Sequence, residues 1–438
     1  GDLWNGDGHT IMVELDGPGS GYGLTSTTSD TTVKGLSITD FEVGVLASVG
    51  SSNTVVQCNY LGLNPDGTAA GNTAAGVASV GANTLVGGLS TGEGNVASGN
   101  VWGAVSYDGA TGFMVRGNFI GTNPSGTSAV ANNIGVNSYT GTVTWSDVTD
   151  NLISGNSEDG IVLNSDDTVT GSSGDALIVG NYIGVSRTGN AILANGESGI
   201  ELNSATVSGF TIGGATSNER NIIAGNSLDG ITLTDVTDVD VLGNYIGLGA
   251  DGSTSIYNRS DSIELNSVSS VNIGDNTSDG RNVLATSEER GVIINGTNSS
   301  ISISGNYIGT DATGNAGIDK NQYSYYGSSD GIGVYGSVST LDILNNVIGN
   351  YETTQIEFWN ASGSNVTIQG NYLDVGADGT TDISNSATAI ESADNSAALR
   401  FGGSISISNL VIGGTGAGEG NIIANNDNLG VFILNSQA

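Results

Sequence analysis

Four glutamates occupy the same place in short segments where apolar and polar residues alternate. These segments are Ile200-Glu201-Leu202, Ile263-Glu264-Leu265, Ile356-Glu357-Phe358 and Ile390-Glu391-Ser392. If such strands stack in parallel, Glu357 and Glu391 would lie about 5 Å apart on neighbouring strands, and Glu201 and Glu264 about 9 to 10 Å apart across one intervening strand. The first spacing suits retaining glycoside hydrolysis and the second suits inverting hydrolysis. The alternative is that each glutamate is a solvated side chain on an outward strand face.

Aromatic residues gather around one long loop and on the strand that follows it. They are Tyr323, Tyr325, Tyr326, Tyr335 and Trp359. An aromatic ring offers a large apolar face, and tyrosine adds a hydroxyl group, so such a cluster fits both sides of a sugar ring. We interpret these residues as the candidate sugar-binding patch. The alternative is that the rings pack on one another.

Four aspartates lie in loop phrases that follow a repeated strand. They are Asp66, Asp251, Asp311 and Asp378. Carboxylate oxygens are the ligands that calcium prefers, so these loops are candidate calcium sites, although none has EF-hand spacing. Aspartate is also a standard residue of tight turns. The sequence requires no cofactor, and with one histidine and one cysteine it predicts no zinc site.

These side chains must be positioned by a repeated framework. A phrase of the type Gly-Asn-Tyr-Ile-Gly recurs with its asparagines 59 to 65 residues apart, at Asn59, Asn118, Asn181, Asn244, Asn306 and Asn371. A second phrase lies between successive copies, for example from Ile212 to Ile223. Each period therefore comprises two unequal turns, of which one carries a longer loop. Such regularity is the signature of a solenoid.

The segments between the turns have the character of short strands. They alternate apolar and β-branched residues with polar ones over three to five positions, as in Ile301-Ser302-Ile303, and no helical spacing is present. We therefore predict an all-β, right-handed parallel β-helix of about 14 coils, with residues 1–438 as a single domain. Ile200 and Leu202 should point into the coil and Glu201 outward. Stacked asparagines are expected to form a ladder, and the predicted set is Asn164, Asn203, Asn266, Asn295, Asn360 and Asn435.

Composition excludes several classes of function. The 438 residues include 9 Lys and Arg against 44 Asp and Glu, for a net charge of −35. Such a charge repels phosphate backbones, so nucleic acid is not an expected partner. No run of 18 apolar residues is present, and membrane insertion is not expected. The acidic balance suits cations, a salty environment or a secreted protein.

The phrase from Gly305 to Gly314, with Gly413-Gly414 and Asn421-Ile422-Ile423, resembles bacterial secreted and surface proteins built from right-handed parallel β-helix repeats, the pectate-lyase-like fold. The resemblance covers about residues 10 to 435 and implies a secreted or cell-surface location. That fold carries lyases, hydrolases, epimerases, adhesins and structural rods. Its lyases use clustered basic residues, often with calcium, whereas the nine basic residues here are scattered.

The strand pattern begins near Ile11 and Val13 and still runs at Val431 and Ile433, without a recognisable cap. Open strand edges favour self-association through the terminal coils, or the chain has been excised from a longer precursor. Our first hypothesis is thus an extracellular structural or adhesive rod, a filament or surface-layer subunit that assembles end to end. The alternatives are a polysaccharide lyase or glycoside hydrolase, and a carbohydrate-binding module.

Overall fold

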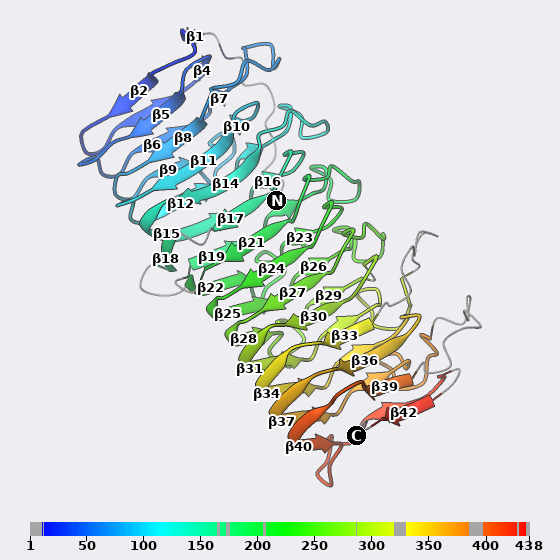
Figure 1. Ribbon diagram of the computed structural model, residues 1–438. Helices are drawn as coiled ribbons and strands as arrows, with labels where there is room; N and C mark the ends of the chain where they lie inside the picture. Colours follow the sequence, from blue (N-terminus) through cyan, green and yellow to red (C-terminus); the bar gives the residue numbers. More distant parts are fainter. Residues whose placement is uncertain are drawn as a thin grey trace. The chain divides into compact units, whose positions relative to one another are not determined.

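The computed structural model describes residues 11, 13–163, 167–171, 176–204, 207–285, 287–318, 330–384, 397–426 and 429–434. These residues contain strands, turns and bends but no helix. The chain divides into two compact units, the first comprising residues 1–211 and 221–227 and the second residues 212–220 and 228–438. Figure 1 labels the strands of both units.

Each coil of unit 1 gives one strand to each of three parallel sheets. Sheet 1 comprises β1 (Val13–Asp16), β4 (Leu36–Thr39), β7 (Tyr60–Leu61), β10 (Val96–Ala97), β13 (Phe119–Ile120), β16 (Leu152–Ile153), β20 (Tyr182–Ile183) and β23 (Ile222–Ile223). Sheet 2 comprises β2 (Tyr22–Ser26), β5 (Val43–Ala47), β8 (Ala75–Ser79), β11 (Trp102–Tyr107), β14 (Ile134–Tyr139), β17 (Ile161–Leu163) and β21 (Ile200–Asn203). Sheet 3 comprises β3 (Thr32–Lys34), β6 (Val55–Gln57), β9 (Leu85–Gly87), β12 (Phe113–Arg116), β15 (Gly141–Thr149), β18 (Asp167–Gly171), β19 (Ala176–Val179) and β22 (Ser208–Gly213), whose last residues belong to unit 2.

Unit 2 repeats the same plan. Its sheet 1 strands are β26 (Tyr245–Ile246), β29 (Val283–Leu284), β32 (Tyr307–Ile308), β35 (Val347–Ile348), β38 (Tyr372–Leu373) and β41 (Ile422–Ile423). Its sheet 2 strands are β24 (Ile231–Thr234), β27 (Ile263–Asn266), β30 (Val292–Asn295), β33 (Asp330–Val334), β36 (Thr354–Trp359), β39 (Ala397–Gly402) and β42 (Leu429–Ile433). Its sheet 3 strands are β25 (Thr237–Leu242), β28 (Ser269–Ile273), β31 (Thr297–Ser304), β34 (Ser337–Leu344), β37 (Ser362–Gln369) and β40 (Ser406–Ile412).

The strand order confirms the predicted right-handed parallel β-helix. Each strand pairs in parallel with the equivalent strand of the next coil, for example Ile263 with Val292 and Leu265 with Ile294. Over both units, sheet 1 has 14 strands among the described residues, which matches the expected number of coils.

The core lies inside the coils and follows the alternation of the sequence. Ile200 and Leu202 have no exposed surface, while Glu201 between them is half-buried on the outer side, as predicted. Aromatic rings also fill part of the interior. In unit 2, Phe358 and Phe401 stack with their ring centroids 4.7 Å apart.

Buried asparagines join the coils into ladders, but the predicted set was wrong. The described members of that set are half-buried or exposed on the outside, where Asn203 and Asn295 donate to Glu201 and Glu264. The ladder instead uses the asparagines of the two repeated phrases, where each Nδ2 donates to the Oδ1 of the next coil. In unit 1 these are Asn59, Asn95, Asn118, Asn151, Asn181 and Asn221. In unit 2 they are Asn244, Asn282, Asn306, Asn346, Asn371 and Asn421.

A second ladder in unit 1 runs along another corner of the coils. It comprises Asn72, Asn100, Asn132, Asn156, Asn195 and Asn226, again with Nδ2 of each donating to Oδ1 of the next. Every rung lies inside the molecule, where a corner leaves backbone groups without ladder partners. The amide side chains supply those partners, so the corners are fixed by the interior asparagines.

Alternate coils carry the longer loop. Each such loop follows the Asn-Tyr-Ile-Gly phrase and is closed by an isolated antiparallel bridge, as between Leu63 and Ala69 or between Thr310 and Gly317. The glycine that opens the loop is required by packing: Gly309 has φ +84°, and a Cβ there would lie 1.9 Å from the carbonyl oxygen of Gly349.

Loops two coils apart contact each other within each unit. The backbone N–H of Arg187 donates to the Gly126 carbonyl at 3.0 Å in unit 1, and that of Ala312 donates to Gly252 at 2.9 Å in unit 2. Within each unit these loops therefore follow one another along one side of the coils.

Candidate functional site

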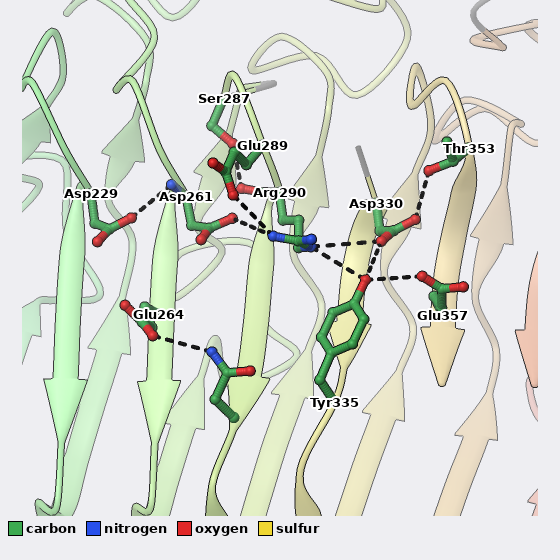
Figure 2. A network of polar contacts seen from close by, with 11 residues as sticks. Asp229, Asp261, Glu264, Ser287, Glu289, Arg290, Asp330, Tyr335, Thr353 and Glu357 are labelled. Carbon is green, nitrogen blue, oxygen red and sulfur yellow. Dashed lines mark hydrogen bonds and ion pairs between the residues drawn. The ribbon is translucent and has the colours of Figure 1, made fainter. Parts of the chain in front are cut away.

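The outer face of sheet 2 in unit 2 carries a network of charged side chains (Figure 2). The strands place them there by simple alternation, because inward positions such as Ile356 and Phe358 are fully buried in the coil and Glu357 points the other way. Glu264 holds the equivalent outward position on β27.

A second row comes from the corner before each of these strands. Each of these residues lies two positions before the first inward side chain of a sheet 2 strand. In four successive coils they are Asp229, Asp261, Arg290 and Asp330. Our sequence-based predictions did not include this row. The sequence marks this row by a repeated three-residue phrase: a charged residue, then glycine or serine, then isoleucine or valine. Examples are Asp229-Gly230-Ile231 and Asp330-Gly331-Ile332. The glycine is fixed by close packing, since a Cβ on Gly331 would lie 2.5 Å from the Gln355 carbonyl oxygen.

Tyr335 lies at the centre of this network, which we call the Tyr335 cluster: Asp261, Arg290, Asp330, Tyr335, Glu357 and Arg400. The phenol oxygen is 2.7 Å from Asp330 Oδ2 and 2.9 Å from Glu357 Oε2. Arg290 Nε donates to the same oxygen at 3.3 Å, and its guanidinium lies over the tyrosine ring at 5.0 Å from the centroid. One hydroxyl group therefore bridges two carboxyl groups from adjacent coils.

Two arginines flank the carboxyl groups. Arg400 Nη1 donates to Glu357 Oε1 at 2.8 Å, and its guanidinium stacks on Trp359 at 4.7 Å from the ring centroid. Arg290 lies 3.7 Å from Asp330 and 3.9 Å from Asp261. Thr353 adds a hydrogen bond to the other oxygen of Asp330, at 2.7 Å.

Burial keeps part of this cluster protonated near neutral pH. Glu357 is 5% exposed, and its burial together with the charge of Asp330 raises its pKa to about 7. Burial and the neighbouring Asp229 carboxylate raise the pKa of Asp261 to about 8. Burial and the charge of Asp330 also raise the pKa of Tyr335, so its hydroxyl stays protonated. Desolvation of the charged form is the common cause.

The structure brings together some of the predicted catalytic and sugar-binding residues. Glu357 and Tyr335 are direct hydrogen-bond partners, and Trp359 lies on the same strand as Glu357 with Arg400 between them. Glu264 lies further along the sheet, where burial raises its pKa and Asn295 donates to it at 3.2 Å.

The predicted pairing of Glu357 with Glu391 was wrong. The position beside Glu357 on the next coil is taken by Arg400, because β39 is the strand Ala397–Gly402. The pair is therefore a salt bridge and not two carboxyl groups. Glu391 itself lies outside the described residues, as do Tyr323, Tyr325 and Tyr326.

Glu201 belongs to unit 1, where it forms a separate acidic group. Asp159 is buried nearby, and its burial together with the charge of Glu201 raises the pKa of Asp159 to about 7. The backbone N–H of Ser198 donates to Asp159 at 2.8 Å. Glu201 and Glu264 lie in different units.

The four loop aspartates bind their own loops. Asp311 Oδ1 accepts from the backbone N–H of Thr313 and from its hydroxyl, at 3.1 and 2.7 Å. Asp66, Asp251 and Asp378 accept equivalent bonds from a following threonine. Hydrogen bonds from Thr381 lower the pKa of Asp378 to about 2. In the described part of the chain, no three His, Cys, Asp or Glu side chains are grouped so as to hold a metal ion.

The fold is similar to that of a solved bacterial protein module. The A-module of a mannuronan C-5 epimerase from Azotobacter vinelandii is 13% identical, with a TM-score of 0.34 over 87% of this chain and 91% of that one. No family model matches the sequence, and no curated protein matches it. Among the described residues, no helix is long and apolar enough to cross a membrane.

Proposed function

We propose that the chain is a polysaccharide-active enzyme of the glycoside hydrolase type, with the Tyr335 cluster as its catalytic site. The observation that carries this proposal is the Tyr335 hydroxyl, which lies within 2.9 Å of both the Asp330 and the Glu357 carboxyl groups. Glycoside hydrolysis needs two carboxyl groups of this kind, one protonated and one ionised.

The hydrogen-bond geometry favours unequal protonation of the pair. A phenol has one proton to donate, so it can donate to only one of the two carboxyl groups at a time. The second contact is a hydrogen bond only if that carboxyl group carries a proton itself. Glu357, with a pKa of about 7, is the group that holds it. Asp330 Oδ2 and Glu357 Oε2 both contact the phenol oxygen of Tyr335, so these two carboxyl oxygens are less than about 6 Å apart. That spacing suits a retaining pair.

In the proposed reaction, Glu357 acts as general acid and protonates the glycosidic oxygen of the leaving sugar. Asp330 is the second carboxyl group. One of its oxygens forms a covalent bond to the anomeric carbon as the bond from that carbon to the leaving oxygen breaks. Water then releases the sugar from Asp330, and Glu357 takes back a proton from that water. Because Asp330 has no exposed surface, the side chains that cover it must shift before a sugar can reach it.

The charges of the site favour a neutral polysaccharide. Asp229, Asp261, Glu264 and Glu289 form an acidic group on the coils that precede the pair, whereas Arg290 and Arg400 already bind carboxylates of the protein. A uronic acid would bring a further negative charge, and the described arginines of the site, Arg290 and Arg400, are already paired with carboxylates. This supports hydrolysis rather than the lyase alternative, which depends on neutralising an acidic sugar.

Release of reducing ends from polysaccharides tests this proposal. Purified protein would be incubated with neutral β-glucan, xylan and galactomannan, and with polygalacturonate as the acidic comparison. We expect release from a neutral substrate, and a loss of about 10² to 10⁴-fold in Glu357→Gln. Glu14→Gln, an exposed strand glutamate, is the matched control. No release by the intact protein, or unchanged release by Glu357→Gln, would refute the assignment.

The structural or adhesive alternative has one observation in its favour. Val431 and Ile433 of β42 are 45% and 60% exposed although their strand positions face the coil interior elsewhere. A second copy stacked on β42 would cover them and continue the strand pairing. Sedimentation and negative-stain microscopy across salt concentrations would show filaments in that case, and Ile433→Lys should abolish them. A monomer under all these conditions argues against end-to-end assembly.

A further inference from the structure

Sheet 2 of unit 1 has an apolar and aromatic outer face. In unit 2 the outward positions of this sheet carry acids and arginine. In unit 1 the equivalent positions carry Val43, Ala75, Ala78 and Val105, and these residues form a buried cluster on the outer side of the coil. Leu46, Ala74, Trp102 and Tyr107 pack against it. Strands β2, β5, β8, β11 and β14 contain no charged residue.

Three aromatic rings cover one part of this face, and we call Trp102, Tyr107 and Tyr139 the aromatic platform. Trp102 and Tyr139 lie with ring centroids 4.9 Å apart and planes inclined by 39°. Tyr107 stands edge-on to both, at 6.3 and 5.8 Å. Tyr139 remains 45% exposed. The rings are therefore held by one another while still presenting surface to solvent.

Polar groups surround the platform. Burial, with smaller contributions from the nearby Tyr139, Glu42 and Tyr22, raises the pKa of the Tyr107 hydroxyl to about 12. Asn137 pairs with Val105 and precedes Tyr139 by two residues, so it belongs to the same strand face. Its side chain is 1% exposed, and its Oδ1 accepts no hydrogen bond from the described residues. A buried amide oxygen without a donor is costly.

We infer that the aromatic platform binds a neutral polysaccharide. Its rings offer apolar faces to the C–H side of a sugar ring, and its phenol groups offer hydrogen bonds to sugar hydroxyls. The charges beside it are acidic, Glu42 and the Asp108 that follows Tyr107, and strands β2, β5, β8, β11 and β14 carry no cation to meet an acidic sugar.

A second copy of the chain fits this surface less well. The apolar floor is already covered, since Ala75, Ala78 and Val105 have no exposed surface, so a protein partner would gain little from burying it. Two copies with a net charge of −35 each also repel one another. What the platform still offers is ring faces and hydroxyl groups, which is what a sugar chain uses.

Affinity electrophoresis and calorimetry with soluble β-glucan, xylan and galactomannan test the inference, with polygalacturonate as the acidic probe. We expect binding to at least one neutral polysaccharide and none to polygalacturonate. Trp102→Ala and Tyr139→Ala should each weaken that binding at least tenfold, while Tyr139→Phe retains the ring and most of the affinity. Tyr245→Ala, an aromatic residue stacked by Arg220 in unit 2, is the matched control and should bind normally.

Three results would overturn the inference: no binding to any neutral polysaccharide, binding that is unchanged in soluble, folded Trp102→Ala, or self-association through the platform that Trp102→Ala abolishes. If Trp102→Ala fails to fold, Tyr139→Leu and Tyr139→Phe decide between ring stacking and simple apolar cover. The inference does not rest on the proposed hydrolysis. Platform-dependent binding without release of reducing ends would refute the hydrolase proposal and support the platform. Release of reducing ends without platform-dependent binding would refute the platform and support the hydrolase proposal.

Discussion

At the scale of single residues, Glu357 is the group on which the site depends. Arg400 and Asp330 act on it in opposite directions, since the guanidinium favours its ionised form and the Asp330 carboxylate disfavours it. Burial is the main cause of its raised pKa of about 7, and the charge of Asp330 adds to it. The two charged neighbours adjust this pKa and can be removed one at a time.

We predict that these two neighbours shift the pH dependence of hydrolysis in opposite directions. Activity should fall as pH rises above about 7, because the acid form of Glu357 is then lost. Arg400→Gln removes a positive charge and raises the pKa of Glu357. The fall in activity, the alkaline limb of the pH profile, then moves to higher pH. Asp330→Asn removes a negative charge and moves the Glu357 pKa to lower pH.

The limb is measured in kcat/KM between pH 5 and 9. Since Asp330→Asn also removes a proposed catalytic group, its Glu357 pKa is read by carboxyl NMR titration of the folded protein rather than by activity. Shifts of equal sign in the two variants would contradict the proposed electrostatics.

Sequence reasoning identified Glu357 and Tyr335 but not the residues that connect them. Glu357 was visible because the alternation Ile356-Glu357-Phe358 fixes its outward direction. Arg290 and Asp330 lie at a corner, where no alternation indicates a direction, and their contact with Tyr335 depends on which coils are adjacent. Arg400 was missed because the strand after residue 390 was placed several positions too early.

At the scale of elements, the asparagine ladders fix the corners of the coils. Asn132 accepts from the backbone N–H and the side chain of Asn100, and it donates to Asn156 and to the carbonyl of Ala97. Asn133, the next residue, is exposed and contacts Glu158 at 3.3 Å. Two adjacent asparagines therefore have very different surroundings.

We predict that Asn132→Ala lowers the free energy of unfolding by about 3 to 5 kcal/mol, because the buried Asn100 N–H loses its acceptor and the buried Asn156 Oδ1 loses the donor Asn132 Nδ2. Asn133→Ala should change it by less than about 0.5 kcal/mol. Urea unfolding followed by circular dichroism measures both. Equal effects of the two substitutions would show that the ladder is not what holds the corner.

The ladder also shows why the strands were easier to predict than the corners. Alternation alone predicts which side of the strand is occupied by Ile200, Glu201 and Leu202. Asparagines occur both inside and outside, and Asn203 and Asn266 end strands on the outer face just as regularly as Asn244 recurs inside. Only the three-dimensional register separates the two sets.

The long loops lead to a prediction about calcium. Because Asp251, Asp311 and Asp378 already accept hydrogen bonds from their own threonines, we expect millimolar calcium to leave the Tm unchanged, with the chelator-treated protein as reference. Asp311→Ala should lower the Tm slightly by loosening its loop. A calcium-dependent rise in Tm that Asp311→Ala removes would instead support the calcium-site hypothesis.

At the scale of the whole molecule, the buried acids make stability depend on pH. Burial raises the pKa of Asp159, Glu357 and Asp374 to about 7 and that of Asp261 to about 8. In the unfolded chain these groups ionise near pH 4. Between those values the folded state holds protons that the unfolded state has lost.

We therefore predict that stability decreases as pH rises from about 5 to 8, by at most about 1.4 kcal/mol per pH unit for each such group. The sign follows because raised folded pKa values stabilise the protein fully below the unfolded pKa and lose that effect as pH passes the folded pKa. Thermal unfolding at constant ionic strength measures this. Asp261→Asn and Glu357→Gln should flatten the curve, and a stability that rises steadily to pH 8 would contradict the prediction.

The contact between loops two coils apart also limits how such a chain can lengthen or shorten. In unit 1 the loop near Gly126 binds the loop near Arg187, and the coil between them carries no loop of that kind. Insertion or loss of a single coil would place a loop against a loopless neighbour and break the series. Gain or loss of a pair, such as the 63 residues that separate Asn118 from Asn181, leaves every loop with a partner. The molecule is thus expected to tolerate duplication and deletion in steps of two coils.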